Sequence, residues 1–223
     1  MKPEEFPGLE YLRVDSGALC QAAKSLECES FAGLGYEGKG PVMTEYEGYP
    51  SVFYVAIFEG GDVVGVVRKI LPGPKGLPTV NSFRLNPTNP TLETALGRPE
   101  ACEDMATTAI KKGFRARYNF ACVLNLWRLA LRDAIRAGIE DMFTAVEPIV
   151  LLHYRNVFHL PLEELGPAQD YLGAPCIPCV LSLQDCASEL YVKDVELAAW
   201  FEEGAPGFSR QIARACLSQA GAV

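Results

Sequence analysis

Apolar and polar positions along the chain follow patterns that predict several β-strands. The apolar segments SVFYVAIF (51–58) and DVVGVVRKIL (62–71) flank the turn sequence Glu-Gly-Gly-Asp, which is typical of a β-hairpin. After a loop rich in proline and glycine, TVNSFRL (79–85) has the composition of a third antiparallel strand. Further strands are predicted at 102–110, 141–146 and 174–184.

The clearest helical pattern lies between the strands predicted at 102–110 and 141–146. Its apolar residues recur every three or four positions and form one stripe: Phe120, Leu124, Trp127, Leu131 and Ile135. Asn119 can cap the start of this helix and Gly138 can end it. Other helices are predicted at 16–28, at 147–157 and in the tail at 193–220, with a helical turn at 91–96.

This order of elements predicts a mixed α/β (α+β) fold in which helices flank a largely antiparallel sheet. The chain has 223 residues, nearly half of them apolar and 22% charged, which suits one globular domain over 1–223. We expect its core at about 16–185 and a C-terminal helical extension at 186–223. No phosphate-binding glycine loop follows any predicted strand.

Charge changes this picture because it is unevenly distributed. The net charge of −8 disfavours nucleic acid as a partner. Residues 111–136, however, carry seven basic side chains against Asp133, and this segment favours a phosphate-bearing or acidic partner. Within it, Arg128, Arg132 and Arg136 form a stripe that can meet an acidic protein or simply face solvent.

The chain shows no sign of export or of a membrane span. Its N-terminal segment lacks the basic and then apolar order of a secretory signal, and its apolar runs are far shorter than a spanning helix requires. We therefore expect a cytoplasmic protein. Among eight cysteines, Cys176 and Cys179 have CxxC spacing, which we interpret as two reduced thiols in a proline-rigid turn; a redox or zinc role is the alternative. No metal site is predicted.

Several short motifs occur in the order found in one superfamily of acyltransferases. Phe31 and Tyr36 lie in FAGLGY, and an acidic pair, Glu45 and Glu47, precedes the first hairpin. Val64-Gly65-Val66-Val67-Arg68 is followed by Leu71-Pro72, Glu103 begins a later strand, and a helix with Tyr154 comes before the last strand. Over about 16–185 the chain resembles the Gcn5-related N-acetyltransferase (GNAT) superfamily, in the branch of autoinducer synthases and long-chain N-acyl amino acid synthases.

The resemblance implies transfer of an acyl group from a thioester to a small amine. No tightly bound cofactor is implied, and the co-substrate would be an acyl thioester on an acyl carrier protein or on coenzyme A. Glu103 would be the base or orient the amine, and Tyr154 would protonate the departing sulfur. Arg68, Glu45, Glu47, Phe31 and Tyr36 would surround the acceptor, with Arg68 either paired with one of the two glutamates or facing a substrate carboxylate.

The donor would bind at the basic start of the long helix, where backbone N–H groups also favour anions. The residues concerned are Lys111, Lys112, Arg115, Arg117 and Asn119. The sequence FRARYN stands where the superfamily usually has its pyrophosphate loop, which suits a carrier-protein thioester better than coenzyme A. Position 106 is Ala where autoinducer synthases carry Arg, which argues against a lactone product. A short-chain coenzyme A-dependent N-acetyltransferase and a non-catalytic binding protein are the alternatives.

Overall fold

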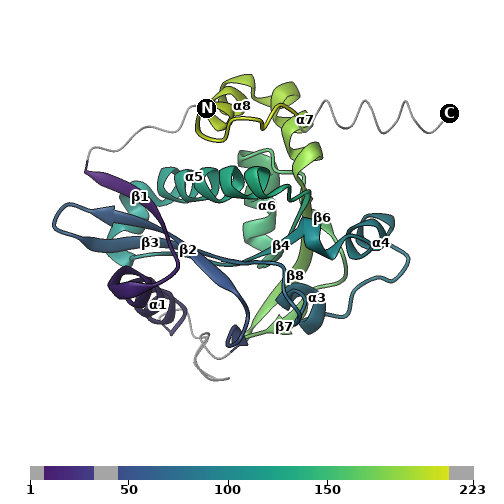
Figure 1. Ribbon diagram of the computed structural model, residues 1–223, viewed down its shortest axis with the longest axis horizontal. Helices are drawn as coiled ribbons and strands as arrows, with labels where there is room; N and C mark the ends of the chain where they lie inside the picture. Colours follow the sequence, from purple (N-terminus) through teal and green to yellow (C-terminus); the bar gives the residue numbers. More distant parts are fainter. Residues whose placement is uncertain (1–7, 33–44, 211–223) are drawn as a thin grey trace.

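The computed structural model describes residues 8–32 and 45–210, without the side chains of residues 116–120. Its centre is an eight-stranded sheet in the order β1-β2-β3-β4-β5-β8-β6, with β7 paired to β8 (Figure 1). The strands are β1 (Leu9–Val14), β2 (Ser51–Phe58), β3 (Asp62–Ile70), β4 (Cys102–Ile110), β5 (Asp141–Val146), β6 (Glu163–Glu164), β7 (Gln169–Tyr171) and β8 (Ala174–Ser182). All pairs are antiparallel except β4 with β5. The predicted mixed, largely antiparallel fold is confirmed.

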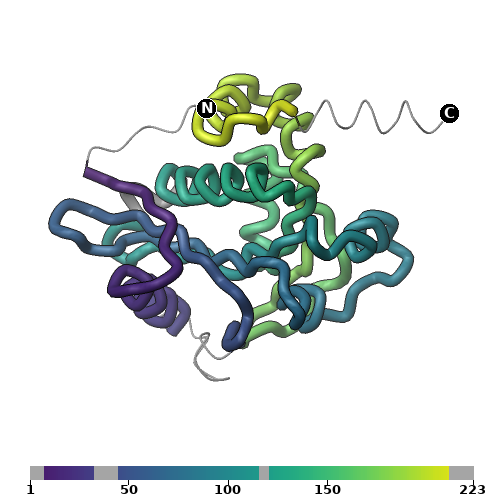
Figure 2. Tube along the Cα trace, in the orientation of Figure 1, coloured from purple at the N-terminus to yellow at the C-terminus, as the bar shows by residue number. Residues whose placement is uncertain are grey.

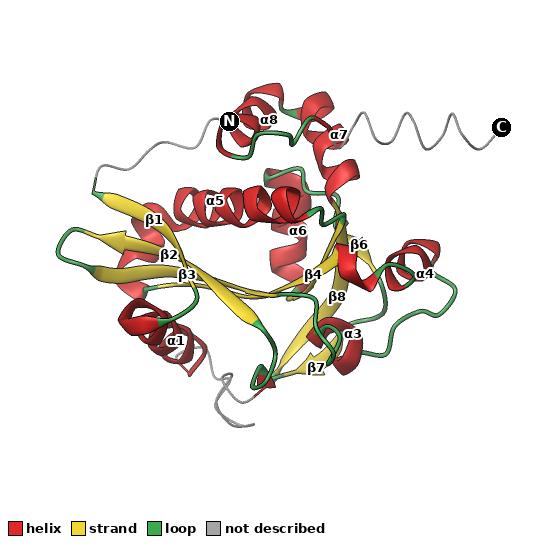
Figure 3. Cartoon of the chain, viewed as in Figure 1, coloured by secondary structure: helices red, strands yellow, loops and turns green. Residues whose placement is uncertain are grey.

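Helices cover both faces of this sheet (Figure 3). One face packs against α1 (Gly17–Ala32), whose Cys20, Ala23 and Leu26 meet apolar side chains of β2, β3 and β4. The other face packs against α5 (Lys112–Ala137) and α6 (Pro148–Val157) in the main core. The remaining helices are α3 (Pro78–Ser82), α4 (Pro90–Leu96), the 3-10 helix η2 (Pro99–Ala101), α7 (Leu183–Lys193) and α8 (Val195–Gly204).

The predicted hairpin, the strands at 102–110 and 141–146, and the helix at 147–157 are confirmed. Gly138 ends α5 as expected, in the left-handed conformation with φ 77°, where its N–H bonds back to the last turn. The tail packs as two helices: α7 follows β8 directly, and α8 lies over α5 (Figure 2). The last residues of the predicted tail helices, 211–220, lie outside the described part of the chain.

Three local predictions were wrong or incomplete. Residues 79–85 do not form a strand, because Pro78 begins helix α3 and the buried carboxylate of Asp104 accepts a hydrogen bond from the Thr79 N–H at 2.7 Å. The long helix starts at Lys112 rather than near Asn119, since Arg and Ala favour continuing the helix through this segment. Strand β1 was not predicted; it is a short edge strand that pairs with β2.

Strand β4 contains a β-bulge at Ala106. Arg68 of β3 pairs with Thr107 and Lys69 pairs with Met105, so Ala106 has no partner on β3. Before the bulge Met105 faces the core under α5, and after it Thr107 faces α1, as the short contact of its hydroxyl with Glu27 shows. The bulge therefore changes which side chains of β4 reach each face.

The helix α5 approaches the sheet closely at Gly65. A Cβ at this position would lie 2.7 Å from the sulfur of Cys122 and 2.9 Å from the side chain of Ile110, both shorter than real Cβ contacts. Glycine thus permits the packing of α5 on β3, which places the first turn of α5 beside the end of β4.

Candidate active site

The candidate site is a gap in the sheet between β4 and β5. The two parallel strands pair only over Cys102–Asp104 and Asp141–Phe143, and beyond that point they diverge. At the closed end of the gap the hydroxyl of Thr144 donates to the carbonyl of Met105 at 2.9 Å. A cavity of about 460 Å³ occupies the gap, and residues from both strands line it. This volume is in the range of small-molecule sites.

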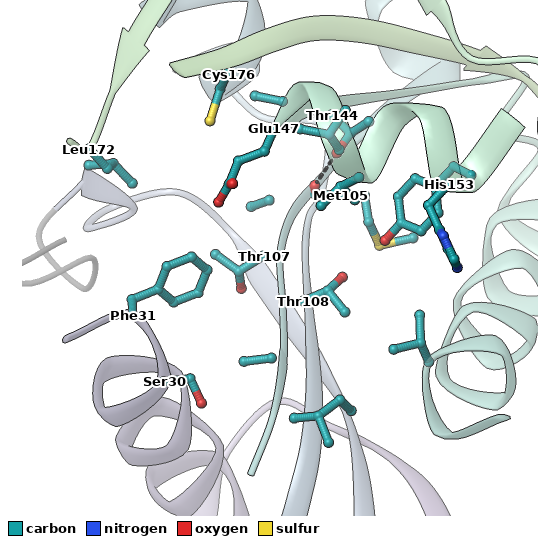
Figure 4. Close-up of a pocket in the computed structure, with 18 of the residues that line it drawn as sticks. Ser30, Phe31, Met105, Thr107, Thr108, Thr144, Glu147, His153, Leu172 and Cys176 are labelled. Atoms are coloured by element: carbon teal, nitrogen blue, oxygen red, sulfur yellow. Dashed lines mark hydrogen bonds between the residues drawn. The ribbon is translucent and has the colours of Figure 1, made fainter. Parts of the chain in front are cut away.

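The cavity reaches both faces of the sheet. On the α5 and α6 side it is lined by Arg115, Val123, Trp127, His153, Tyr154 and Phe158. On the α1 side it is lined by Ser30, Phe31, Tyr46, Tyr171, Leu172 and Thr107. Figure 4 shows this separation, with Phe31 and Ser30 on one side and His153 on the other. Two reactants can therefore approach the gap from opposite faces.

Tyr154 was predicted to be a proton donor, and the structure places it in the cavity wall. Its side chain is buried, with its ring edge-on to Trp127 at a centroid distance of 5.3 Å. Burial raises the pKa of its phenol to about 12, and a hydrogen bond with Thr108 acts in the opposite direction. The phenol is therefore protonated at neutral pH, as a general acid must be before it donates.

Arg68 pairs with neither Glu45 nor Glu47, which corrects one prediction. Its guanidinium lies 2.6 Å from the carboxylate of Glu27 on α1, and both side chains are almost completely buried. The rings of Phe53 and Tyr46 lie 4.7 and 5.0 Å from the guanidinium carbon. The alternative, that Arg68 meets a substrate carboxylate, has no support in this geometry, because Arg68 does not line the cavity.

Glu27 connects this ion pair to the cavity. The hydroxyl of Thr107, which lines the cavity, makes a short hydrogen bond to the other oxygen of the Glu27 carboxylate. Burial raises the pKa of Glu27, while Arg68 and Thr107 oppose that shift. Arg68 thus fixes the carboxylate of Glu27, which in turn orients the hydroxyl of Thr107 in the cavity wall.

Glu103 lies at the closed end of the gap, on the side of the sheet under α5. Its carboxylate is 2.7 Å from the ammonium of Lys69, both groups are buried, and neither lines the cavity. Burial raises the pKa of Glu103, and Lys69 acts against that shift. A catalytic role for Glu103 therefore stays a prediction, and it requires action at a distance from the cavity.

The other predicted acceptor residues are spread around the α1 side. Phe31 lines the cavity, whereas Glu45 does not line it and accepts a hydrogen bond from the hydroxyl of Tyr171, a lining residue, at 3.4 Å. The carbonyl of Glu47 accepts from Lys75, away from the gap. Tyr36 lies outside the described residues.

The predicted donor residues lie at the start of α5. Lys111 is the residue before the helix, Lys112 is its first residue, and Arg115 in the first turn lines the cavity. Arg115 also donates to the carbonyl of Ile110 at 2.8 Å, which ties it to the end of β4. The backbone positions of Arg117 and Asn119 are helical, so Asn119 is not the cap, but their side chains lie outside the description.

The remaining features have structural explanations. Cys176 and Cys179 both lie on strand β8, three residues apart, so they face opposite sides: Cys176 lines the cavity and Cys179 lies in the main core. The predicted turn is thus a strand, and both cysteines are free.

Among the described residues no cluster of His, Cys, Asp or Glu could hold a metal ion. In the arginine stripe, Arg128 is covered by Trp200 of α8 at 4.2 Å.

Sequence reasoning missed the acidic residue of the cavity, Glu147. It directly follows β5, and Figure 4 shows its carboxylate pointing into the cavity. A signal was available, because ligands of open α/β sheets bind at the carboxyl ends of the strands. The tyrosines Tyr46 and Tyr171 were also missed; their hydroxyls are 3.3 Å apart, and no spacing in the sequence connects them.

No protein-family model and no curated protein matches the sequence. Solved structures do match the fold. FeeM, an N-acyl amino acid synthase from uncultured soil microbes, aligns with a TM-score of 0.60 at 18% identity, over 81% of this chain and 95% of that one. BjaI, a coenzyme A-dependent acyl-homoserine lactone synthase, aligns with a TM-score of 0.53 at 17% identity, over 89% and 91% of the two chains.

A third structure is an acyl-CoA N-acyltransferase from Pseudomonas aeruginosa, with a TM-score of 0.54 at 12% identity, over 78% of this chain and 99% of that one. In the described part of the chain, every helix is too short or too polar to cross a membrane. The sheet with its β4–β5 gap, the helices on both faces and these three alignments together show that the chain has the fold of the Gcn5-related N-acyltransferases.

Proposed function

We propose that this protein is an N-acyltransferase that moves a fatty acyl group from a thioester to a small amine. The observation that carries the proposal is the cavity between β4 and β5, which is open to both faces of the sheet in a fold shared with several acyltransferases. A thioester would enter from the α5 side and an amine from the α1 side, so that they meet in the gap.

The donor side has the chemistry that an acyl thioester needs. The wall formed by Val123, Trp127 and Phe158 is apolar and suits an acyl chain. Lys112 and Arg115, with the N–H groups of the first turn of α5, would bind the phosphate of phosphopantetheine. That phosphate is common to coenzyme A and to an acyl carrier protein, and the carrier protein is the partner that the sequence favours.

The reaction forms one bond and breaks one. The amine nitrogen attacks the thioester carbonyl carbon, a C–N bond forms, the C–S bond breaks, and the amine loses a proton while the departing thiolate gains one. Peptide groups of β4 beyond Asp104 are not paired with β5, so those that face the gap are available to orient the carbonyl. Tyr154 would give its phenolic proton to the thiolate.

The test is amide formation by the purified protein. Acetyl, octanoyl and palmitoyl thioesters of coenzyme A and of acyl carrier protein would be offered with a panel of amines, and products identified by mass spectrometry. We expect a long-chain amide, and we expect Tyr154→Phe to lower kcat by about 100-fold. Tyr191→Phe, in α7 beside Phe208, is the matched control. Absence of an amide from every combination would refute the proposal.

A further inference from the structure

We infer that the hydroxyl of Thr107 accepts a hydrogen bond from the attacking amine and relays its proton to the carboxylate of Glu27. The inference rests on the proposed function and adds the groups that deprotonate the acceptor.

The position of Thr107 is the first observation. Thr107 lies on β4 just beyond the bulge at Ala106, and it lines the cavity. Figure 4 shows it on the side of Ser30 and Phe31, which belong to the last turn of α1. In the proposed reaction the amine enters from this side, so Thr107 lies in the wall that the amine would contact.

The contact between Thr107 and Glu27 is the second observation. The hydroxyl of Thr107 donates a hydrogen bond to one carboxylate oxygen of Glu27, and the other oxygen lies 2.6 Å from the guanidinium of Arg68. Because a guanidinium stays protonated, this ion pair favours the charged carboxylate, which only accepts hydrogen bonds. The hydroxyl proton of Thr107 is therefore directed to Glu27, and the lone pairs of its oxygen can accept an N–H from the cavity.

Packing holds Glu27 in this position. It lies on α1, where positions 27, 30 and 31 share one face of the helix and the last two line the cavity. Arg68 reaches it from β3 and Thr107 from β4, and all three side chains are buried. The proton acceptor is thus fixed before the amine binds, so that its ordering costs nothing during the reaction.

The neighbouring residue, Thr108, contacts the proposed acid. Thr107 and Thr108 are consecutive on β4 and face opposite sides of the sheet, as Figure 4 shows. Thr108 forms a hydrogen bond with Tyr154, whose phenol is protonated at neutral pH. Burial raises the pKa of Glu27, while Arg68 and Thr107 oppose the shift, so its carboxylate is a stronger base than an exposed glutamate. One face of the sheet would therefore remove a proton and the other would supply one.

The proton transfers balance. A neutral amine donates one N–H to the oxygen of Thr107, and its nitrogen attacks the thioester carbon. As the C–N bond forms, the N–H proton passes to the Thr107 oxygen while the hydroxyl proton passes to Glu27. The C–S bond breaks, and the thiolate takes a proton from Tyr154. Glu27 then releases one proton to solvent and Tyr154 regains one, so that an amine and a thioester give an amide and a thiol.

The experiment replaces the hydroxyl and leaves the ion pair intact. Thr107→Val removes the hydroxyl, and Thr107→Ser keeps it. Binding of two probes, phenylalanine and phenethylamine, is measured by calorimetry without donor, and turnover is then measured with the donor that gives product. We expect Thr107→Val to weaken binding by about tenfold and to lower kcat by about 100-fold, and Thr107→Ser to retain most of both.

The chain offers a matched control for this change. The hydroxyl of Thr91 also donates to a glutamate carboxylate, that of Glu163 at 2.7 Å, and neither residue lines the cavity. Thr91→Val and Glu163→Gln should leave binding and kcat unchanged. Urea unfolding of every variant gives the folded fraction to which kcat is referred.

Glu27→Gln tests the role of Glu27, which acts through Thr107. We expect kcat to fall by about 100-fold while the KM for the donor is retained. The double variant Thr107→Val/Glu27→Gln should be no slower than the slower single variant, because both changes break the same relay. If Glu27→Gln misfolds, the comparison of Thr107→Val with Thr107→Ser decides, since both keep the pair of Glu27 with Arg68.

Failure of the inference and failure of the proposed function are distinguishable. An undiminished kcat in Thr107→Val, or losses that multiply in the double variant, would overturn the inference even if amides form. Weaker binding of the probes to Thr107→Val, with no amide from any donor, would support Thr107 as the group that binds the amine and refute the proposed acyl transfer. Neither binding nor product with the original protein would refute both.

Discussion

Arg68 and Lys69 are neighbours on β3, yet they belong to different parts of the molecule. The pleat of the strand directs Arg68 toward α1 and Lys69 toward α5, and each meets a buried carboxylate, Glu27 or Glu103. The first pair continues through Thr107 to the cavity, whereas the second lies in the closed core beside Tyr54. A buried ion pair therefore supports the cavity wall on one face of the sheet and the core on the other.

The largest effect should come from breaking the core pair. Lys69→Ala leaves the Glu103 carboxylate buried without its cation, and we expect a loss of about 3–5 kcal/mol in the free energy of unfolding, measured with urea. The double variant Lys69→Met/Glu103→Leu removes both charges and should recover most of that loss. Equal stability of Lys69→Ala and the original protein would show that the pair is not a structural element.

Glu103→Gln separates this structural role from the catalytic role predicted from sequence. Because Glu103 does not line the cavity, we expect kcat per folded molecule to stay close to that of the original protein. A catalytic base would instead lower kcat by about 100-fold or more when replaced. Such a loss of kcat, with an unchanged free energy of unfolding, would support the catalytic role that the sequence predicts for Glu103.

Asp104 is a third buried carboxylate to compare with Glu27 and Glu103. It accepts a hydrogen bond from the Thr79 N–H, whereas the other two form ion pairs. Burial raises its pKa to about 7. The folded state therefore binds this proton more tightly than the unfolded chain, where the pKa is about 4, and the stabilisation present below pH 4 is lost as the pH rises to about 7.

Asp104→Asn removes this titration. Between pH 4 and pH 8 we expect the free energy of unfolding of the original protein to fall by roughly 2–4 kcal/mol relative to the variant. The measurement is a series of urea titrations of both proteins in matched buffers. Parallel curves would mean that the Asp104 carboxylate titrates alike in the folded and unfolded states.

The smallest effect should come from a conservative change in the pair near the site. Arg68→Lys keeps the charge but loses the planar group that lies against Phe53 and Tyr46, and we expect about 1 kcal/mol of destabilisation. Because Glu27 orients Thr107, the KM for the amine should rise as well. Arg13→Lys, in a half-exposed ion pair with Asp133, is the control. An unchanged KM would separate the Arg68 pair from the cavity.

Elements with strong local signals were predicted correctly. The hairpin has a glycine turn between apolar runs, and α5 has a continuous apolar stripe and a glycine stop. The segment 79–85 failed because a contact with Asp104, about twenty-five residues away along the chain, decides its conformation. Strand β1 failed because a six-residue edge strand carries little periodicity of its own.

The site was predicted less well than the fold for a similar reason. Tyr154 and Phe31 were identified by resemblance and do line the cavity, but the partner of Arg68 was sought in the acidic pair Glu45 and Glu47 that precedes the hairpin. Glu27 lies 41 positions from Arg68 in the sequence. It is on α1, and only the packing of this helix distinguishes it from the other glutamates there. Glu147 looked like an ordinary residue at the start of a helix, because the cavity exists only where β4 and β5 separate.

Ala106, which has no partner on β3, divides β4 into two halves whose side chains alternate out of phase. Up to Met105 odd-numbered side chains lie beneath α5, and beyond the bulge the odd-numbered side chains lie beneath α1. In a strand of the same length without the bulge, the far half would turn over, so that Thr107 and Thr108 would exchange sides. The chemistry on each side of the cavity therefore depends on the bulge as much as on the identity of the threonines.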